Sequence, residues 1–520
     1  IGLASCIIVF LLDCYYNIIL CWAFYYFFAS LTTELPWQHC GHDWNTENCS
    51  EDFTKTLNGT SKSSGTLMDP VTEYWENKVL DISDGLHHIG KLKLDLALCL
   101  LLAWVLVFCC ICGGIKSTGQ VVYVTATSPY IFMVILLVRN SMLDGAMEGV
   151  KYYLTPDISK LTEITVWVDA GTQILFSCSI GLGTLTALGS YNKFTHNSYR
   201  DSVIFSAVNS GTSLLAGLIV FTCLGFMAKQ QRRSIAEVAE SGPGLAFIAY
   251  PKAVAQMPVA SVWSLFFFLM IILIGLDSQF VGVEGVIATV VDQYPLILRK
   301  RYRKLGFTVV CCIVMFLIGL LMVCQGGMYV FQLFDYYSGS RIILLVALCE
   351  LVAIAHVYGI HRFSDNVRMM IGESWLSHTI PYLQVCWAVI SPFFCVVVFA
   401  MSIINYSDLS YRRANGRVYN YPVWGITIGW LLAGTSVVCI PLVAAFKFVK
   451  YGTSYEILKL LMVPYHLHKH QKRPQDYGER SLWEYETERG HYKMSAQMPE
   501  NATNNSGGYV SEHCEMFVKV

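Results

Sequence analysis

Residues 96–114 read LALCLLLAWVLVFCCICGG and carry no charged side chain. A helix that crosses a lipid bilayer needs about 20 predominantly apolar residues, which is the length of this run. The strands of a membrane barrel would instead alternate apolar and polar residues, and this run does not alternate. The stretch therefore predicts a transmembrane α-helix.

Similar stretches recur along the whole chain of 520 residues, and the composition agrees with them. Hydrophobic residues make up 54% and charged residues 14%, with a mean hydropathy of +0.48, whereas about a quarter of a soluble protein is charged. We expect an all-α polytopic membrane protein whose transmembrane domain covers residues 1–446. Its ten predicted spans are residues 1–30, 96–114, 119–138, 171–191, 203–227, 259–291, 306–326, 328–360, 383–404 and 422–446.

Charge and motifs exclude two classes of function. The formal net charge is -1, from 36 Lys and Arg against 37 Asp and Glu, so the basic surplus of a nucleic-acid-binding protein is missing. The spans contain no nucleophile elbow, phosphate-binding loop or paired metal-ligand motif. We therefore expect neither a nucleic-acid partner nor an enzyme.

Basic residues in short loops predict the orientation, because Lys and Arg concentrate on the cytoplasmic side. The densest cluster is residues 299–304, which we place in the cytoplasm. Counting spans from there puts residues 447–520 in the cytoplasm as a C-terminal tail and residues 31–95 outside as a long loop. A second cluster, Lys229, Arg232 and Arg233, disagrees, because this topology leaves it outside.

The long loop and the tail carry their own signals. Asn48 and Asn58 begin glycosylation sequons, and Cys40 and Cys49 lie between the same two spans, as suits an extracellular loop. The tail is polar and without hydrophobic periodicity, so we expect it to be mostly disordered. Its end, residues 518–520, could add as a strand to a PDZ-type partner, although two valines at that spacing often occur by chance.

An acidic residue inside a span is costly and is a functional candidate. Asp277 lies in the apolar run LMIILIGLDSQF and is followed by Ser278. Carboxylate and hydroxyl oxygens suit a hard cation, and the carbonyl of Ile274 joins them if Gly275 loosens the helix. The alternatives are a carboxylate that pairs with a neighbouring helix and a proton relay.

A second candidate site combines polar residues with a broken helix. Gln173 and Ser177 lie four residues apart on one face, and Gly181 and Gly183 follow them. Interrupted spans are the best sequence indication of a transporter's binding site, while small-residue helix packing is the alternative. The next span repeats the polar pairing with Asn209 and Ser213, for which interhelical hydrogen bonding is an equally good explanation.

Several other side chains inside the spans are candidates for the same site. Tyr15, Tyr16 and Phe176 would add an aromatic wall and Asp335 an outer carboxylate, although core packing is the more common role of a tyrosine such as Tyr15. Glu284 and Glu350 are also intramembrane carboxylates, and no role is assigned to them.

Longer motifs resemble the neurotransmitter sodium symporters, in particular the branch for GABA, taurine, betaine and creatine. The matching stretches run through most of residues 1–446 and include LLDCYYNIILCWAFYYFF, GTQILFSCSIGLG, SGPGLAFIAYP, GLDSQF and QGGMYVFQLFDYYS. Members of this family have twelve spans, so the resemblance implies that this sequence, which begins without Met, holds the third to the twelfth.

The resemblance also implies residue roles. One sodium ion would use Ser177 and Asn209, and a second would use Ile274, Asp277 and Ser278. Chloride would use Gln173, Ser177, Asn209 and Ser213, and the substrate would contact Tyr16, Phe176, Ser179, Gly181 and Ser278. The outer gate would use Asp335, the inner gate Asp292 and Tyr191, and Cys40 and Cys49 would form a disulfide.

The function that this resemblance implies is sodium- and chloride-coupled import of GABA or a related compound across the plasma membrane. Substrate, ions and surrounding lipid would be its partners, and alternating access its mechanism. A non-transporting, receptor-like protein of the same fold is the alternative, and a channel is a third class, although no repeated filter-like carbonyl motif is present.

Overall fold

The computed structural model describes residues 1–51, 68–193, 196–232, 234–238, 242–298, 300–340, 342–372, 378–413 and 418–451. The sequon at Asn58, Arg233, Arg299 and the C-terminal residues 518–520 lie outside the described residues. The predictions made for them stay predictions.

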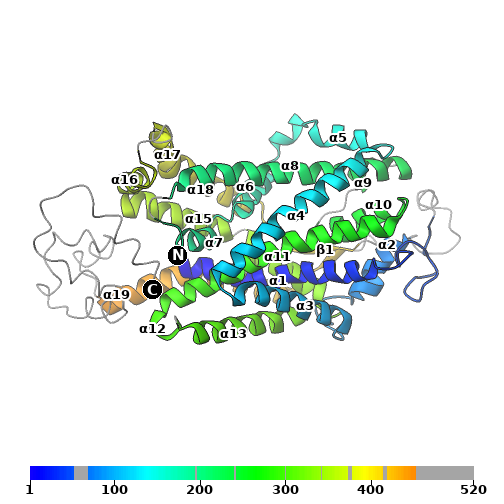
Figure 1. The fold of residues 1–520 in the computed structure, drawn as a ribbon, viewed down its shortest axis with the longest axis horizontal. Helices are drawn as coiled ribbons and strands as arrows, with labels where there is room; N and C mark the ends of the chain where they lie inside the picture. Colours follow the sequence, from blue (N-terminus) through cyan, green and yellow to red (C-terminus); the bar gives the residue numbers. More distant parts are fainter. Residues whose placement is uncertain are drawn as a thin grey trace, which may run out of the picture.

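Helices make up almost all of the described regular structure (Figure 1). The first half contains α1 Gly2–Ala29, α2 Pro70–Glu73, α3 Leu94–Cys112, α4 Ile115–Ser141, α5 Ala146–Leu154, α6 Ile164–Ser177, α7 Thr184–Gly189, α8 Ser198–Gln231, α9 Ile235–Val238 and α10 Tyr250–Ala255. The second half contains α11 Ala260–Gln293, α12 Pro295–Leu298, α13 Arg301–Leu320, α14 Gly327–Phe334, α15 Ile342–Val352, α16 Ile360–Ile371, α17 Ile380–Val385, α18 Ser391–Ile404 and α19 Val423–Tyr451.

Short 3-10 and π-helical turns and one hairpin complete the described fold. The turns are η2 Tyr74–Leu80, η3 Ile158–Thr162, η4 Leu245–Ala249, η5 Asp335–Ser340, η6 Ala353–Gly359 and η8 Cys386–Ile390. The hairpin pairs β1 Ser410–Arg412 with β2 Val418–Asn420, with Tyr411 opposite Tyr419.

The expectation of an all-α polytopic membrane protein is confirmed. Within the described residues, nine helices are long and apolar enough to cross a membrane. The predicted span at residues 171–191 is not among them, because it is broken into α6 and α7. Backbone in the left-handed region causes the break, with φ of 53° at Ser179, 77° at Gly181 and 74° at Gly183.

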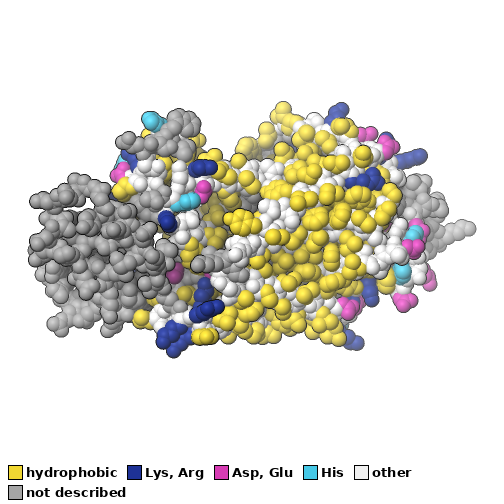
Figure 2. Space-filling view, viewed as in Figure 1, with side chains coloured by type: hydrophobic (Ala, Val, Ile, Leu, Met, Phe, Trp, Pro, Cys, Tyr) yellow, Lys and Arg dark blue, Asp and Glu magenta, His cyan; other side chains and the backbone are white. Residues whose placement is uncertain are grey.

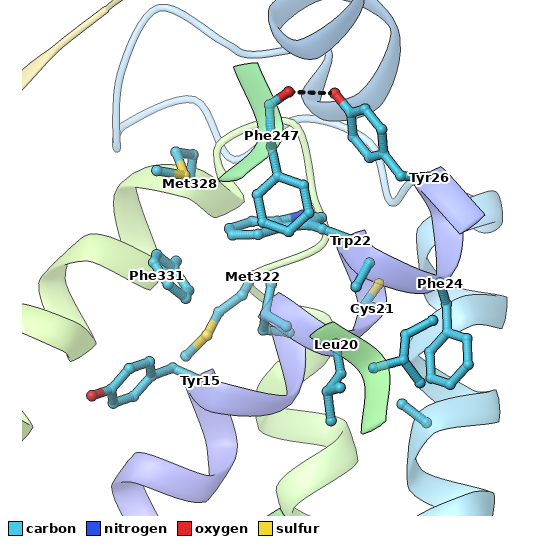
Figure 3. Packing of buried hydrophobic residues seen from close by; sticks show 14 of the residues in the cluster. Tyr15, Leu20, Cys21, Trp22, Phe24, Tyr26, Phe247, Met322, Met328 and Phe331 are labelled. Atoms are coloured by element: carbon cyan, nitrogen blue, oxygen red, sulfur yellow. Dashed lines mark hydrogen bonds between the residues drawn. The ribbon is translucent and has the colours of Figure 1, made fainter. Parts of the chain in front are cut away.

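The core is built around α1, which packs most extensively against α11 and also against α3 and α13. Large aromatic side chains fill the space at one end of α1. Trp22 meets Trp75 edge to face with ring centroids 5.2 Å apart, and the Tyr26 hydroxyl donates to the Phe247 carbonyl at 3.1 Å (Figure 3). Aromatic pairs of this kind hold helices firmly, because they combine large buried area with a preferred geometry. We therefore regard α1 as a rigid support for the groups it carries.

Charged side chains collect toward the two ends of the described part of the molecule, and hydrophobic side chains cover the middle of the face in Figure 2. The loop after α1 and the helix α2 lie at the right-hand end in Figure 1, and α12 lies at the opposite end. The end of α8 lies at the same end of the molecule as the loop (Figure 1). There the ammonium group of Lys229 pairs with Asp144.

The loop after α1 is held in two ways. Cys40 and Cys49 form a disulfide, as the family resemblance implied, with Cα atoms 6.0 Å apart. The carboxylate of Asp69 caps α2 and pairs with Lys252 of α10 at 2.8 Å, with both side chains only 15% exposed. Burial opposes ionisation of Asp69, but the ion pair and the hydrogen bonds from Thr72 outweigh it and hold its pKa below the ordinary value.

Candidate functional site

The break between α6 and α7 is the centre of the site. Ser177 ends α6, and the backbone through Gly181 leaves helical geometry. The carboxylate of Glu350 on α15 accepts hydrogen bonds from the backbone N–H of Gly181 and from the Ser5 hydroxyl, the latter at 3.1 Å. Glu350, which the sequence left without a role, therefore satisfies part of the unwound backbone. Its intramembrane charge was the only sequence signal for this.

Ser177 and Asn209 come together, although 32 positions separate them in the chain. The Asn209 Nδ2 donates to Ser177 Oγ at 2.8 Å, and Ser177 Oγ lies 3.1 Å from Asn209 Oδ1. One turn along α8, the Ser213 hydroxyl donates to the Asn209 carbonyl at 3.0 Å. Gln173 lies one turn before Ser177 on α6 and is exposed. The arrangement collects hydroxyl and amide groups beside the broken helix.

Asp277 lies on α11, where its Oδ1 accepts a hydrogen bond from Thr125 Oγ1 of α4 at 3.0 Å. The Ser278 hydroxyl donates to the Ile274 carbonyl at 3.3 Å and also bonds to the Tyr16 hydroxyl of α1. These contacts join Ser278 to the Ile274 carbonyl, whereas the printed hydrogen bond of the Asp277 carboxylate is to α4. The sequence did not indicate Thr125, because a threonine in an apolar helix is usually a packing residue.

The idea that Gly275 loosens the helix is wrong. The α11 helix runs without interruption from Ala260 to Gln293. A Cβ at position 275 would lie 2.6 Å from Leu20 Cδ2 of α1, so the glycine serves the close approach of these two helices. The carbonyl of Ile274 is therefore offered by a regular helix.

A cavity of about 490 Å³ opens beside the break. It is lined by Gln173, Phe176 and Asp335, to which the family resemblance gave roles at the chloride site, the substrate site and the outer gate. Tyr15 lines it too, with its hydroxyl bonded to the Asp335 carboxylate. Tyr16, Ser179, Gly181 and Ser278, the other residues expected to contact substrate, do not line it.

The two residues expected at the inner gate lie at the other end of the site. Tyr191 follows α7, Asp292 lies near the end of α11, and both are exposed. Tyr191 lies in the neighbourhood of Glu284 and Asp292. The Glu284 carboxylate also forms an ion pair with Lys304 of α13 at 2.9 Å. Glu284, which had no assigned role, thus joins α11 to α13 beside this pair.

Comparison with known proteins identifies the family. The family model for the sodium:neurotransmitter symporter family matches residues 1–451. The chain is similar to the sodium- and chloride-dependent taurine transporter of Bos taurus, at 51% identity over 89% of this chain and 74% of that protein. It is also similar to the sodium- and chloride-dependent GABA transporter 2 of Rattus norvegicus, at 50% identity over 89% of this chain and 76% of that protein. The match covers every helix described above, and the chain belongs to the sodium:neurotransmitter symporter family.

Proposed function

We propose that the protein is a sodium- and chloride-coupled symporter of the plasma membrane that imports GABA, taurine or a closely related compound. Its similar relatives are named as sodium- and chloride-dependent transporters of GABA and of taurine. A receptor-like protein that does not transport is not favoured, because both of these relatives are transporters by name.

The hydrogen-bonded pair of Ser177 and Asn209 beside the helix break is the observation that supports this function best. Oxygen atoms of hydroxyl and amide groups suit a hard cation, while amide N–H and hydroxyl groups suit an anion. With Gln173 and Ser213 within one turn of this pair, sodium and chloride would bind as neighbours. The broken helix adds backbone groups that a regular helix would have engaged.

A second sodium ion would use Asp277, Ser278 and the Ile274 carbonyl. The hydroxyl of Ser278 rests on that carbonyl in this conformation, and Thr125 holds the carboxylate. A bound cation would replace the proton of Ser278 as the partner of the carbonyl, which needs only rotation of the hydroxyl. Inward movement of each sodium charge supplies about 2.3 kcal/mol per 100 mV of membrane potential.

The cavity beside the break would receive the substrate. A zwitterion such as GABA or taurine carries an amine at one end and an acid group at the other. The Asp335 carboxylate suits the amine, and the Ser177–Asn209 site with its bound cation suits the acid group. Phe176 lines the cavity, directly before Ser177 in the chain, and would cover the substrate when the outer gate closes.

Uptake of labelled compounds tests this function. Cells that express the full-length protein are given GABA, taurine, betaine, creatine and glycine, with sodium and then chloride replaced in turn. We expect uptake of GABA or taurine that disappears without sodium and weakens without chloride. Uptake of none of the five, with surface expression confirmed by labelling, would contradict the proposal. Mock-transfected cells provide the control.

A further inference from the structure

The interface between α1 and α11 contains three polar side chains that the transport site does not use. Asp13 and Asn17 lie one turn apart on α1, Gln279 lies on α11, and all three are 0% exposed. The amide nitrogen of Gln279 donates to the Asp13 carbonyl at 3.0 Å. A Cβ at Gly282 would lie 2.2 Å from Asp13 Oδ1, so the carboxylate rests directly against the backbone of α11.

The register of the two helices places these groups in one stripe. Leu20 meets Gly275 at one end of the stripe and Asp13 meets Gly282 at the other, so both helices advance by seven residues between these contacts. Asn17 and Gln279 lie between the two contacts. Positions separated by three, four and seven residues share a helix face. The stripe therefore carries a buried polar layer that runs from the Asp13–Gly282 contact to the apolar Leu20–Gly275 contact.

Within this layer, hydrogen-bond acceptors without a partner outnumber donors without a partner. Both carboxylate oxygens of Asp13, both amide atoms of Asn17 and the Oε1 of Gln279 have no hydrogen-bond partner among the described residues. Four of these five atoms are oxygens, which accept, and one is nitrogen, which donates. A buried carboxylate without a partner costs far more than a neutral polar group. The layer needs one more positively charged or proton-donating group.

Neighbouring side chains do not supply that group. The titratable residues that face Asp13 in the described part of the chain are Cys6, Cys14, Tyr15 and Tyr16 of α1 and Cys312 of α13, none of them basic. The ammonium group of Lys304 on α13 is paired with Glu284 of α11. Within the described residues, no Lys, Arg or His forms an ion pair with Asp13. The missing charge must therefore come from a bound species.

A proton fits this layer better than a metal ion. The helices α1 and α11 run through the layer without interruption. Only four side-chain oxygens of the layer are left, whereas calcium takes six to eight oxygen ligands and magnesium needs a complete octahedron. A proton requires no such shell, because it sits on one oxygen and is shared with a second.

We propose that Asp13 is a proton-binding site. One carboxyl oxygen carries the proton, and a small rotation of the Asn17 or Gln279 side chain would bring an amide oxygen to accept it in a hydrogen bond. The proton comes from water and returns to water when α1 and α11 separate enough to admit it. Loss of the proton leaves a bare carboxylate between the helices and opposes their close packing.

Infrared spectroscopy of the purified protein tests the site directly. A neutral carboxylic acid gives a carbonyl-stretch band that an ionised carboxylate lacks. We expect the wild type to show such a band at neutral pH, and D13N, a neutral variant of nearly the same shape, to lack it. The matched control is D95N, which changes an exposed carboxylate in the first turn of α3 and should keep the band.

Two results would overturn the proposal. One is a wild-type spectrum at neutral pH from which D13N removes no acid band. The other is thermal stabilisation by sodium that D13N abolishes without any loss of an acid band, since this would show a bound metal cation. Should D13N fail to fold, N17L and Q279L keep Asp13 and remove one hydrogen-bonding partner each. At least one of them must then shift the band, and a band unmoved by both contradicts the assignment.

A consequence for transport rests on the proposed function. If uptake is confirmed, wild-type uptake should fall several-fold as the pH is raised past the point where the acid band disappears, while uptake by D13N should not respond. The infrared result does not depend on transport. A protein that shows the band but no uptake therefore contradicts the proposed function alone, and a protein that transports without the band contradicts the proton site alone.

Discussion

At the scale of single residues, the cost of charge in a membrane explains which side chains matter. Asp277, Glu284 and Glu350 each lie in an apolar helix, and each has a polar partner from another helix: Thr125, Lys304 and Ser5. An intramembrane carboxylate without such a partner would cost several kcal/mol. The pairs of Glu284 with Lys304 and of Glu350 with Ser5 hold helices together and have no assigned role at an ion site. Among the described residues, the carboxylate of Asp277 has only a hydroxyl as its hydrogen-bond donor, which leaves it free to hold a cation.

Replacement of Asp277 by Asn tests that interpretation. The change removes the charge at nearly constant volume, so we expect surface expression to be kept and sodium-dependent uptake to be lost. The loss of a charged ligand, worth about 1.5–3 kcal/mol, weakens apparent sodium affinity roughly 10- to 100-fold. T125V is the matched comparison, because it removes the hydrogen bond to the same carboxylate and keeps the charge. Uptake by D277N with the sodium dependence of the wild type would refute the assignment.

At the scale of elements, the broken span is set by three residues in the left-handed region. Ser179 has a φ of 53°, which is uncommon for a residue with a side chain, and Gly181 and Gly183 follow with similar values. A strained conformation of this kind persists only where the surroundings hold it. Here Glu350 of α15 accepts the N–H of Gly181. The element that would bind ions is therefore held by a neighbouring helix.

Gly181→Ala should impair this element. Alanine in the left-handed region costs about 1–2 kcal/mol, and its Cβ would lie 3.2 Å from the Ile343 carbonyl oxygen. We expect uptake to fall about tenfold, since about 1.4 kcal/mol corresponds to a factor of ten. The control is Gly189→Ala at the end of α7, where a Cβ meets no described atom within 4 Å. Equal uptake by the two variants would show that the break does not require glycine.

At the scale of the whole molecule, the loop after α1 is fastened to a distant helix. The ion pair of Asp69 and Lys252 joins positions that are 183 residues apart. Because the pKa of Asp69 is lowered in the folded state, the pair contributes stability above about pH 4. That contribution is lost as the pH falls through the lowered pKa, when the carboxylate becomes protonated.

The variant K252M reveals this contribution. Removal of one partner from a buried pair costs roughly 3 kcal/mol, because the other charge is left uncompensated. We expect K252M to melt at a lower temperature than the wild type at neutral pH, in thermal unfolding followed by fluorescence. The difference should narrow as the pH falls from about 4 through the lowered pKa of wild-type Asp69, below which the carboxylate is neutral in both proteins. A difference that is constant over the whole pH range would rule out the ion pair as its cause.

Apolar length and interrupted periodicity were sufficient to predict the membrane fold. The sequence also predicted the break near Gly181 and Gly183 from glycine spacing. The meeting of Ser177 with Asn209 followed only from a family resemblance, because hydrogen bonds between distant segments leave no local pattern.

The sequence by itself determined the class of protein, the spans and the broken helix, because these depend on composition and local backbone preference. Only the tertiary structure decided which partner each buried polar group receives. In the structure, Glu350 bonds to the unwound backbone at Gly181 and Gly275 lies against Leu20. The carboxylate of Asp13 has no hydrogen-bond partner among the described residues. Burial and pairing depend on which helix faces come together, and an apolar sequence allows many such arrangements until packing selects one.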